Sequence, residues 1–183
     1  MSVAATVAGA PVEVSEVDAR EALLRNAPQV TALPRPGTSE GRQLRRWLTQ
    51  LLVTERLVAR EAETLGVTVT ASTPSLDQVL PDATARLEIG SIAAAALSDP
   101  LARALFAHVT RDVDVDDDTV ADYERRNPGR FPVRDDLAAH LRGAARRRVF
   151  RLWLVSRIAA LVWLAPGYEH PGDPRQPDNT HKH

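Results

Sequence analysis

Hydrophobic residues recur at spacings of three and four along two long stretches of the chain, a period that indicates amphipathic helices. The first stretch covers about residues 39–65 and stops before Gly66, a residue typical of the position after a helix. The second covers about residues 134–159. Two alanine-rich helices are predicted between them, over residues 82–97 and 99–109. The pattern therefore predicts a mainly helical protein.

The two ends of the chain predict short extended segments. Residues 6–12 form two β-prone pieces around Gly9, which can adopt a positive φ angle, and Ser15 is expected to cap the helix that follows. Residues 67–75 are polar and β-branched without a helical period, so we expect a loop there. A second extended piece is predicted at residues 160–163.

Aspartates cluster at residues 112–118, directly before an amphipathic run that reaches Tyr123. A calcium-binding loop of the common type would need a central glycine and a distal glutamate, and both are missing from this cluster. Carboxylates at the start of a helix interact favourably with its dipole. We therefore expect Asp116, Asp117 and Asp118 to open a helix rather than to bind calcium.

The composition restricts the classes of function. Aromatic residues make up only 4% of the 183 residues, so the core is expected to consist mainly of Leu, Val, Ile and Ala. The formal net charge of -1 removes a global electrostatic argument for nucleic-acid binding. Cysteine is absent, which excludes disulfides, thiolate metal sites and cysteine nucleophiles. With no signal-peptide pattern and no long apolar run, we expect a cytoplasmic protein that does not enter the membrane.

Three passages resemble the SurA and PrsA group of parvulin-linked chaperones. Residues 7–12 with 15–18 are similar to the opening strand, turn and first helix of that family. Residues 44–66 are similar to its long helix, including the run Leu-Val-Thr-Glu-Arg-Leu-Val-Ala-Arg-Glu-Ala. Residues 115–131 are similar to the segment that leads into the parvulin module.

The resemblance implies a chaperone part whose catalytic module is missing. After Phe131 and Pro132 the chain passes at once into the helix that normally follows the parvulin module. Residues of a parvulin active site therefore have no counterpart here, and prolyl isomerase activity is not implied. The resemblance also implies that the opening segment pairs with residues 161–164, in a mainly α fold like the SurA N-terminal domain with a short β pairing of its N- and C-terminal segments. We expect this helical domain over residues 1–165, followed by a Pro- and His-rich tail over residues 166–183.

The last predicted helix carries a basic run, which is a candidate anion site. Its arginines are Arg142, Arg146, Arg147, Arg148 and Arg151. Because residues four apart are neighbours on a helix, these arginines are expected to form one charged face, and Arg142, Arg146 and Arg147 are its candidate contacts for a phosphate, a phosphopantetheinyl carrier protein or RNA. RNA is the weaker candidate because few aromatic residues are available for base stacking. The alternative, which the sequence favours, is a solvated face paired with Asp135, Asp136 or the acidic cluster at residues 112–118.

The tail concentrates side chains that bind divalent metals. Its candidate ligands are Glu169, His170, Asp173, His181 and His183. Imidazole and carboxylate groups together suit zinc or iron, and His181 and His183 form a common local pair. Proline-rich terminal segments are equally typical of disordered chain, so the cofactor prediction is either none or one divalent metal.

Two hypotheses for the function remain open. In the first, the protein is a chaperone-like or adaptor-like binding protein that holds a peptide, a partner enzyme or a carrier protein in an apolar groove between the two long helices, with Trp47, Leu51 and Trp153 as candidate contacts. In the second, it is a metal-dependent enzyme of small-molecule biosynthesis that uses the tail. Serine-nucleophile and phosphate-loop motifs are absent from the sequence, so no catalytic residue is assigned.

Overall fold

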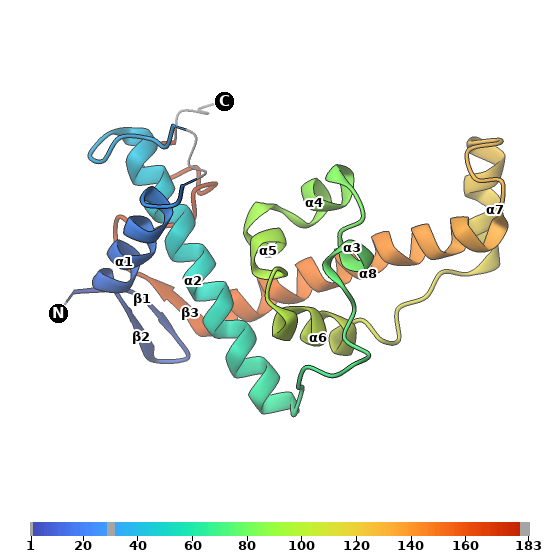
Figure 1. Ribbon diagram of the computed structural model, residues 1–183, viewed down its shortest axis with the longest axis horizontal. Coiled ribbons are helices and arrows are strands. Elements are labelled where there is room, and N and C mark those ends of the chain that lie inside the picture. The colour runs from blue at the N-terminus through green and yellow to red at the C-terminus, as the bar shows by residue number, and fades with distance from the viewer. Residues whose placement is uncertain (1, 29–31, 180–183) are drawn as a thin grey trace. The chain divides into compact units, whose positions relative to one another are not determined.

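The structure is a computed structural model that describes residues 2–28 and 32–179 (Figure 1). Contacts divide the chain into two compact units. The first unit combines the N-terminal part up to Arg60 with the C-terminal part from Arg157 onward, and the second unit comprises Glu61–Ser156. The tail from residue 166 to residue 179 therefore lies within the first unit, whereas the sequence suggested a division after residue 165.

The first unit contains a three-stranded antiparallel sheet. Its strands are β1 (Val3–Val7), β2 (Ala10–Glu13) and β3 (Val162–Leu164), in the order β2-β1-β3. Ala5 of β1 lies opposite Leu164 of β3, so the opening segment pairs with a segment near the other end of the chain. The predicted fold class, mainly helical with a short β pairing of the N- and C-terminal segments, is confirmed.

A two-residue turn joins β1 to β2. Ala8 and Gly9 have φ angles of 49° and 83°, so both central residues are in the left-handed region. Such turns match the right-handed twist of the two strands that they connect. The Ala8 N–H also donates a hydrogen bond of 2.7 Å to the carbonyl oxygen of Leu161, which attaches the turn to the residue before β3.

Helix α1 (Val14–Arg25) begins before the residue that the sequence suggested. Glu13, not Ser15, is the residue that precedes the first helical turn. The Glu13 N–H donates a hydrogen bond of 2.7 Å to a side-chain oxygen of Glu16, which satisfies a donor that the helix leaves free. The expected Ser15 cap is wrong because a glutamate can fill the same role two residues earlier.

The core of the first unit forms where α1 and α2 (Ser39–Leu65) meet the sheet. Ala4, Val17 and Leu48 are almost fully buried together, and Tyr168 from the tail packs against this cluster. The observed range of α2 confirms the predicted helix. It ends before Gly66, whose φ of 66° is the left-handed conformation that glycine adopts without strain.

The second unit is helical. Its elements are α3 (Leu76–Val79), α4 (Ala83–Ile89), α5 (Ser91–Ala96), α6 (Pro100–Val109), α7 (Asp117–Arg126) and most of α8 (Arg134–Leu161). The single helix predicted over residues 82–97 is wrong, because Gly90, with a φ of 90°, separates α4 from α5. The alanines on both sides of Gly90 favour helix, so the sequence pattern did not indicate that the helix is interrupted there.

Aspartates open three of these helices. Asp82 accepts a hydrogen bond from the Ala85 N–H, and Asp99 precedes Pro100 at the start of α6. Asp116 accepts one from the Thr119 N–H at 2.7 Å, while Asp117 and Asp118 lie in the first turn of α7. The prediction that Asp116–Asp118 open a helix is confirmed.

Aromatic rings fill the centre of the second unit. Phe150 of α8 is 1% exposed, and its ring meets Phe106 of α6 edge to face with a centroid distance of 5.2 Å. Trp153 stacks against the Phe150 ring with a centroid distance of 5.7 Å. Leu105 and Leu154 are buried beside them in the same helices. These contacts fix which side of α8 faces inward within the unit.

The connection from α7 to α8 is short and packed. Phe131 lies 6.3 Å from Tyr123 of α7 and 5.0 Å from His140 of α8, measured between ring centroids. Arg134, the first residue of α8, forms an ion pair with Glu124 of α7. The chain therefore passes from Phe131 directly into α8, as the sequence led us to expect.

Candidate functional site

The five arginines of the basic run lie around α8 and line two different pockets. Arg142, Arg146 and Arg147 line one, and Arg148 and Arg151 line the other. Both pockets are formed by residues of the second unit alone. The arginines therefore do not form the single charged face that the helical spacing suggested, although the three candidate anion contacts line the same pocket.

The first of these, the α3–α8 pocket, has a volume of about 370 Å³. Its arginines face Gln78 of α3 and Phe106 of α6, and Pro74 lies on the loop side. The lining thus combines guanidinium groups with apolar surface. A pocket of this size can hold a small ligand or a phosphorylated side chain.

Arg147 has a structural role in this pocket. It is 5% exposed, and it donates hydrogen bonds to a carboxylate oxygen of Glu88 at 3.1 and 3.2 Å and to the Val79 carbonyl at 3.4 Å. A β-carbon at Gly143 would lie 3.3 Å from Nη1 of Arg147, closer than most such contacts. Gly143 therefore leaves room for the Arg147 side chain to fold back along α8.

Arg142 and Arg146 differ in their partners. Arg142 Nε donates to Asp114 Oδ1 at 2.8 Å, and this hydrogen bond, together with one from the Val115 N–H, holds the pKa of Asp114 below its ordinary value. Arg146 adds a smaller electrostatic contribution in the same direction. The Nε of Arg146 itself is buried and has no hydrogen-bond partner in the part of the chain that the structure describes.

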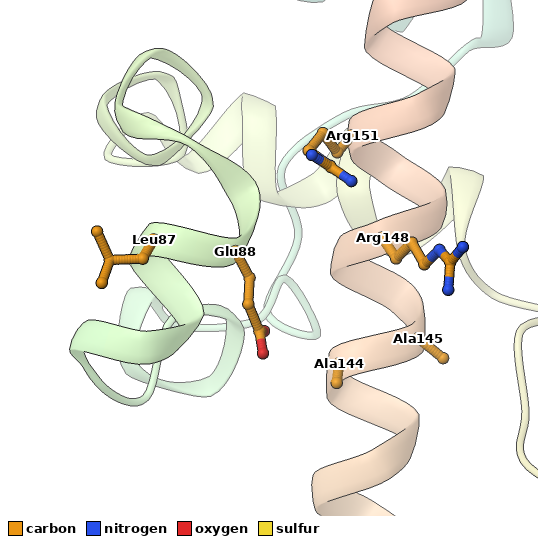
Figure 2. A pocket seen from close by; sticks show the side chains of 6 residues that line it. All are labelled: Leu87, Glu88, Ala144, Ala145, Arg148 and Arg151. Carbon is orange, nitrogen blue, oxygen red and sulfur yellow. The ribbon is translucent and has the colours of Figure 1, made fainter.

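The second hollow, the α4–α8 pocket, has a volume of about 640 Å³. Figure 2 shows Glu88 extending from α4 into the space between the two helices, and Ala144 and Arg151 on the side of α8 nearer α4. Leu87 and Arg148 extend away from that space (Figure 2). Within residues 2–28 and 32–179, neither Arg148 nor Arg151 has an ion pair.

Next to Arg148 and Arg151, α8 carries a row of exposed apolar side chains. Val149, Leu152 and Val155 are 37%, 54% and 60% exposed. Spaced by three residues, they follow one another along the helix between the two arginines and beyond them. We call Arg148, Val149, Arg151, Leu152 and Val155 the α8 face. The helical period alone did not separate these apolar residues from the buried ones on the same helix.

Of the three residues predicted to contact a partner, Leu51 is buried, whereas Trp47 and Trp153 are partly buried. Trp47 packs against the core cluster of the first unit, and Leu51 is 7% exposed one turn further along α2. Trp153 belongs to the second unit and stacks on Phe150. These side chains contribute to cores, and the predicted groove between the two long helices stays a prediction.

The carboxylates of the tail are engaged with arginines. Glu169 accepts a hydrogen bond from the Gly167 N–H at 2.9 Å, which holds its pKa below the ordinary value, and it pairs with Arg46 at 3.5 Å. Asp173 accepts hydrogen bonds from the backbone and the guanidinium of Arg175, and these lower its pKa as well. Each of the two carboxylates thus has an arginine partner.

Among residues 2–28 and 32–179, no group of three or more histidine and acidic side chains is placed to hold a metal ion. His170 accepts a hydrogen bond at Nδ1 from the Gly172 N–H at 3.0 Å, close to Asp173 in the tail. The predicted ligands His181 and His183 lie outside the described residues. The metal prediction therefore stays a prediction.

Sequence reasoning missed the contact that attaches the tail to α2. Asp178 Oδ2 accepts a hydrogen bond of 2.7 Å from Arg46, and Oδ1 pairs with Arg42. Gln43 also donates to the Asp178 carbonyl at 3.1 Å. Arg46 is 2% exposed although it stands in a helix with an apolar stripe. The helical period places Arg46 on the side of α2 opposite the predicted stripe through Leu48 and Leu51, so the period gave no signal of this buried carboxylate partner.

In the described part of the chain, no helix combines the length and the apolar character that crossing a bilayer requires.

Comparison with known proteins finds a similarity at the N-terminus. A family model described as "Family of unknown function (DUF7158)" matches residues 3–40. The matched stretch contains β1, β2, α1 and the first residues of α2. No curated protein and no solved structure matches the chain. The chain is thus similar to this family over its opening hairpin and first helix.

Proposed function

We propose that the protein is a chaperone-like or adaptor-like binding module that docks an acidic, amphipathic segment of a protein partner on the α8 face. The observation that carries this proposal is the exposure of Val149, Leu152 and Val155 beside Arg148 and Arg151. The partner segment belongs to a peptide, an enzyme or a carrier protein.

The apolar half of the proposal rests on exposure. Leu152 and Val155 leave more than half of their surface accessible on a helix whose opposite side is buried around Phe150. Covering apolar surface is favourable by about 25 cal/mol per Å², so the packing of a partner on this row stabilises the complex. Rows of apolar residues on one side of a helix are a common recognition surface for a second amphipathic helix.

The two arginines of the α8 face determine which sign of charge the partner should carry. Arg148 and Arg151 border the apolar row and have no ion pair with the described residues, so their charges are available to a ligand. Glu88 is near this side of α8, but its carboxylate is already paired with Arg147. Opposite charges accelerate association and exclude partners of the wrong sign. An acidic segment therefore fits better than a neutral or basic one.

A peptide-binding experiment tests this function. The probe is a labelled helical peptide with leucines at spacings of three and four and glutamates on both flanks, and binding to the full chain is followed by fluorescence anisotropy. We expect Leu152→Asp to weaken binding by about tenfold or more, because an aspartate removes the central apolar contact and repels the glutamates. Raising the salt concentration should weaken binding by the wild-type protein.

Leu23→Asp is the matched control, because Leu23 is 70% exposed on α1 and carries the same change of side chain. It should leave peptide affinity unchanged. Equal losses in the two variants, or equal binding of a peptide with lysine in place of glutamate, would contradict the docking proposal.

The same proposal predicts that the protein does not accelerate cis/trans isomerisation of a prolyl test peptide. The reason is that the chain runs from Phe131 into α8 at Arg134. The measurement is a standard coupled or fluorescence-based isomerisation assay. A rate clearly above the uncatalysed one would show that a catalytic site exists elsewhere in the chain.

The metal-dependent enzyme stays a second hypothesis without an observation in its favour. A metal at Glu169 or Asp173 would have to displace Arg46 or Arg175 from the carboxylate. Elemental analysis of protein purified without metal-affinity chromatography tests it directly.

A further inference from the structure

We propose that the α3–α8 pocket is a binding site for the phosphoryl group of a phosphate monoester, with Arg146 and Arg142 as its ligands. The site lies on a different side of α8 from Arg148 and Arg151, so this inference is independent of the docking function. The shared chemistry of its possible ligands is a dianionic phosphoryl group attached to a small organic group.

The first step is the charge of the pocket. Three guanidinium groups line it, and two of them have a carboxylate partner: Glu88 for Arg147 and Asp114 for Arg142. Arg146 has none among the described residues, so the pocket carries one uncompensated positive charge. Its buried Nε also lacks a hydrogen-bond acceptor, a situation that is costly unless a ligand or water supplies one.

The second step is the exchangeable partner of Arg142. The Asp114 side chain is 69% exposed, and its contact with Arg142 shows that an anionic oxygen can reach this guanidinium from the solvent side. The three terminal oxygens of a phosphoryl group can bind Arg142 and Arg146 at the same time. The Asp114 carboxylate pairs with Arg142 alone. Ligand binding is therefore expected to compete with Asp114.

The third step is the role of Arg147 and the apolar lining. Arg147 is buried between Glu88 and the Val79 carbonyl, so its charge is compensated and it forms part of the pocket wall without binding the ligand. Phe106 and Pro74 give the pocket an apolar part. An organic group attached to the phosphate can lie there, and the volume of about 370 Å³ is sufficient for a small aromatic or aliphatic ester.

Calorimetric titration of the full chain with phenyl phosphate tests the site. We expect binding by the wild-type protein, weaker binding of inorganic phosphate through the same residues, and at least tenfold weaker binding of benzoate, which offers a single charge. Arg146→Gln should weaken phenyl phosphate binding by about tenfold or more because it removes the unpaired cation. Arg148→Gln is the matched control on the other side of α8 and should leave the affinity unchanged.

A second pair of variants gives a test of opposite sign. Asp114→Asn should strengthen phenyl phosphate binding because it removes the competitor for Arg142. Asp112→Asn is the matched control, because it changes the net charge by the same amount. Asp112 pairs with the exposed Arg111, which does not line the pocket, so this variant should have little effect on phenyl phosphate affinity. The proposal is overturned if phenyl phosphate does not bind at millimolar concentration, if benzoate binds equally well, if Arg146→Gln and Arg148→Gln lose the same affinity, or if the two aspartate variants behave alike.

Discussion

Replacing Phe150 with alanine is expected to lower the free energy of unfolding by about 3 to 5 kcal/mol. Phe150 is 1% exposed and touches the rings of Phe106 and Trp153, so the truncated side chain leaves a cavity between α6 and α8 within the second unit. The surrounding rings lose their contacts and can relax only in part. Denaturant unfolding followed by circular dichroism measures the change.

Leu152→Ala is the matched control for Phe150→Ala. Leu152 stands two residues further along α8 but is 54% exposed, so its truncation should change stability by less than about 0.5 kcal/mol. If the two variants were equally stable, Phe150 would not be a core residue of the second unit. Leu152→Ala also distinguishes an effect on binding from an effect on folding. This variant should bind the peptide more weakly than the wild-type protein while keeping its free energy of unfolding.

Asp178→Asn is expected to release the tail from α2 and to lower the Tm by about 5 °C or more. The reason is that Arg46, which is 2% exposed, would lose its nearest charged partner at 2.7 Å. Glu169, at 3.5 Å, is a poorer partner. Removing one member of a buried ion pair is more destabilising than replacing both members with apolar residues, since the remaining charge stays buried without a partner. Differential scanning calorimetry and proteolysis of the tail report the two effects.

The same contact predicts a dependence on pH. Hydrogen bonds and charges from Arg42 and Arg46 hold the pKa of Asp178 well below its ordinary value. A carboxyl group whose pKa is lower in the folded state stabilises the fold fully above its unfolded-state pKa of about 4, and that contribution is lost as the pH falls toward the folded-state value. Asp178→Asn should therefore reduce the stability difference between pH 7 and pH 3.

Asp173→Asn is the control for this variant, because Asp173 pairs with Arg175 inside the tail and makes no ion pair with α2. It should leave tail proteolysis nearly unchanged. An Asp178→Asn variant with wild-type Tm and a tail that resists protease would show that Tyr168 and the core cluster hold the tail without the ion pair.

The long helices were predictable because they depend on local pattern, whereas the pairing of the N- and C-terminal segments was expected only from the family resemblance. The apolar spacing in residues 39–65 and the glycine after it are sufficient to place α2, and aspartate at the start of α7 follows from the free N–H groups of a first turn. The break at Gly90 was not predicted, because alanine on both sides favours helix and one glycine inside a helix is often tolerated.

The candidate sites were predictable to a smaller extent. Spacing along one helix indicated a basic run on α8, but it did not show that Arg148 and Arg151 line a different pocket from the other three arginines. It did not indicate that Arg147 is buried against Glu88, because that contact joins residues from different helices. Trp47 and Trp153 are partly buried and pack against the core cluster and Phe150, and a role for them in partner contact stays a prediction.

The sequence alone therefore determines the helical class, the extents of the two long helices and the run of positive charges along α8, because these follow from interactions between residues close in the chain. The tertiary structure decides which of those charges are free. Asp178 reaches Arg46 across more than a hundred residues, and Asp114 and Glu88 neutralise Arg142 and Arg147, whereas Arg146 keeps an unpaired Nε. Pairings of this kind depend on how distant segments pack, and local pattern carries no information about them.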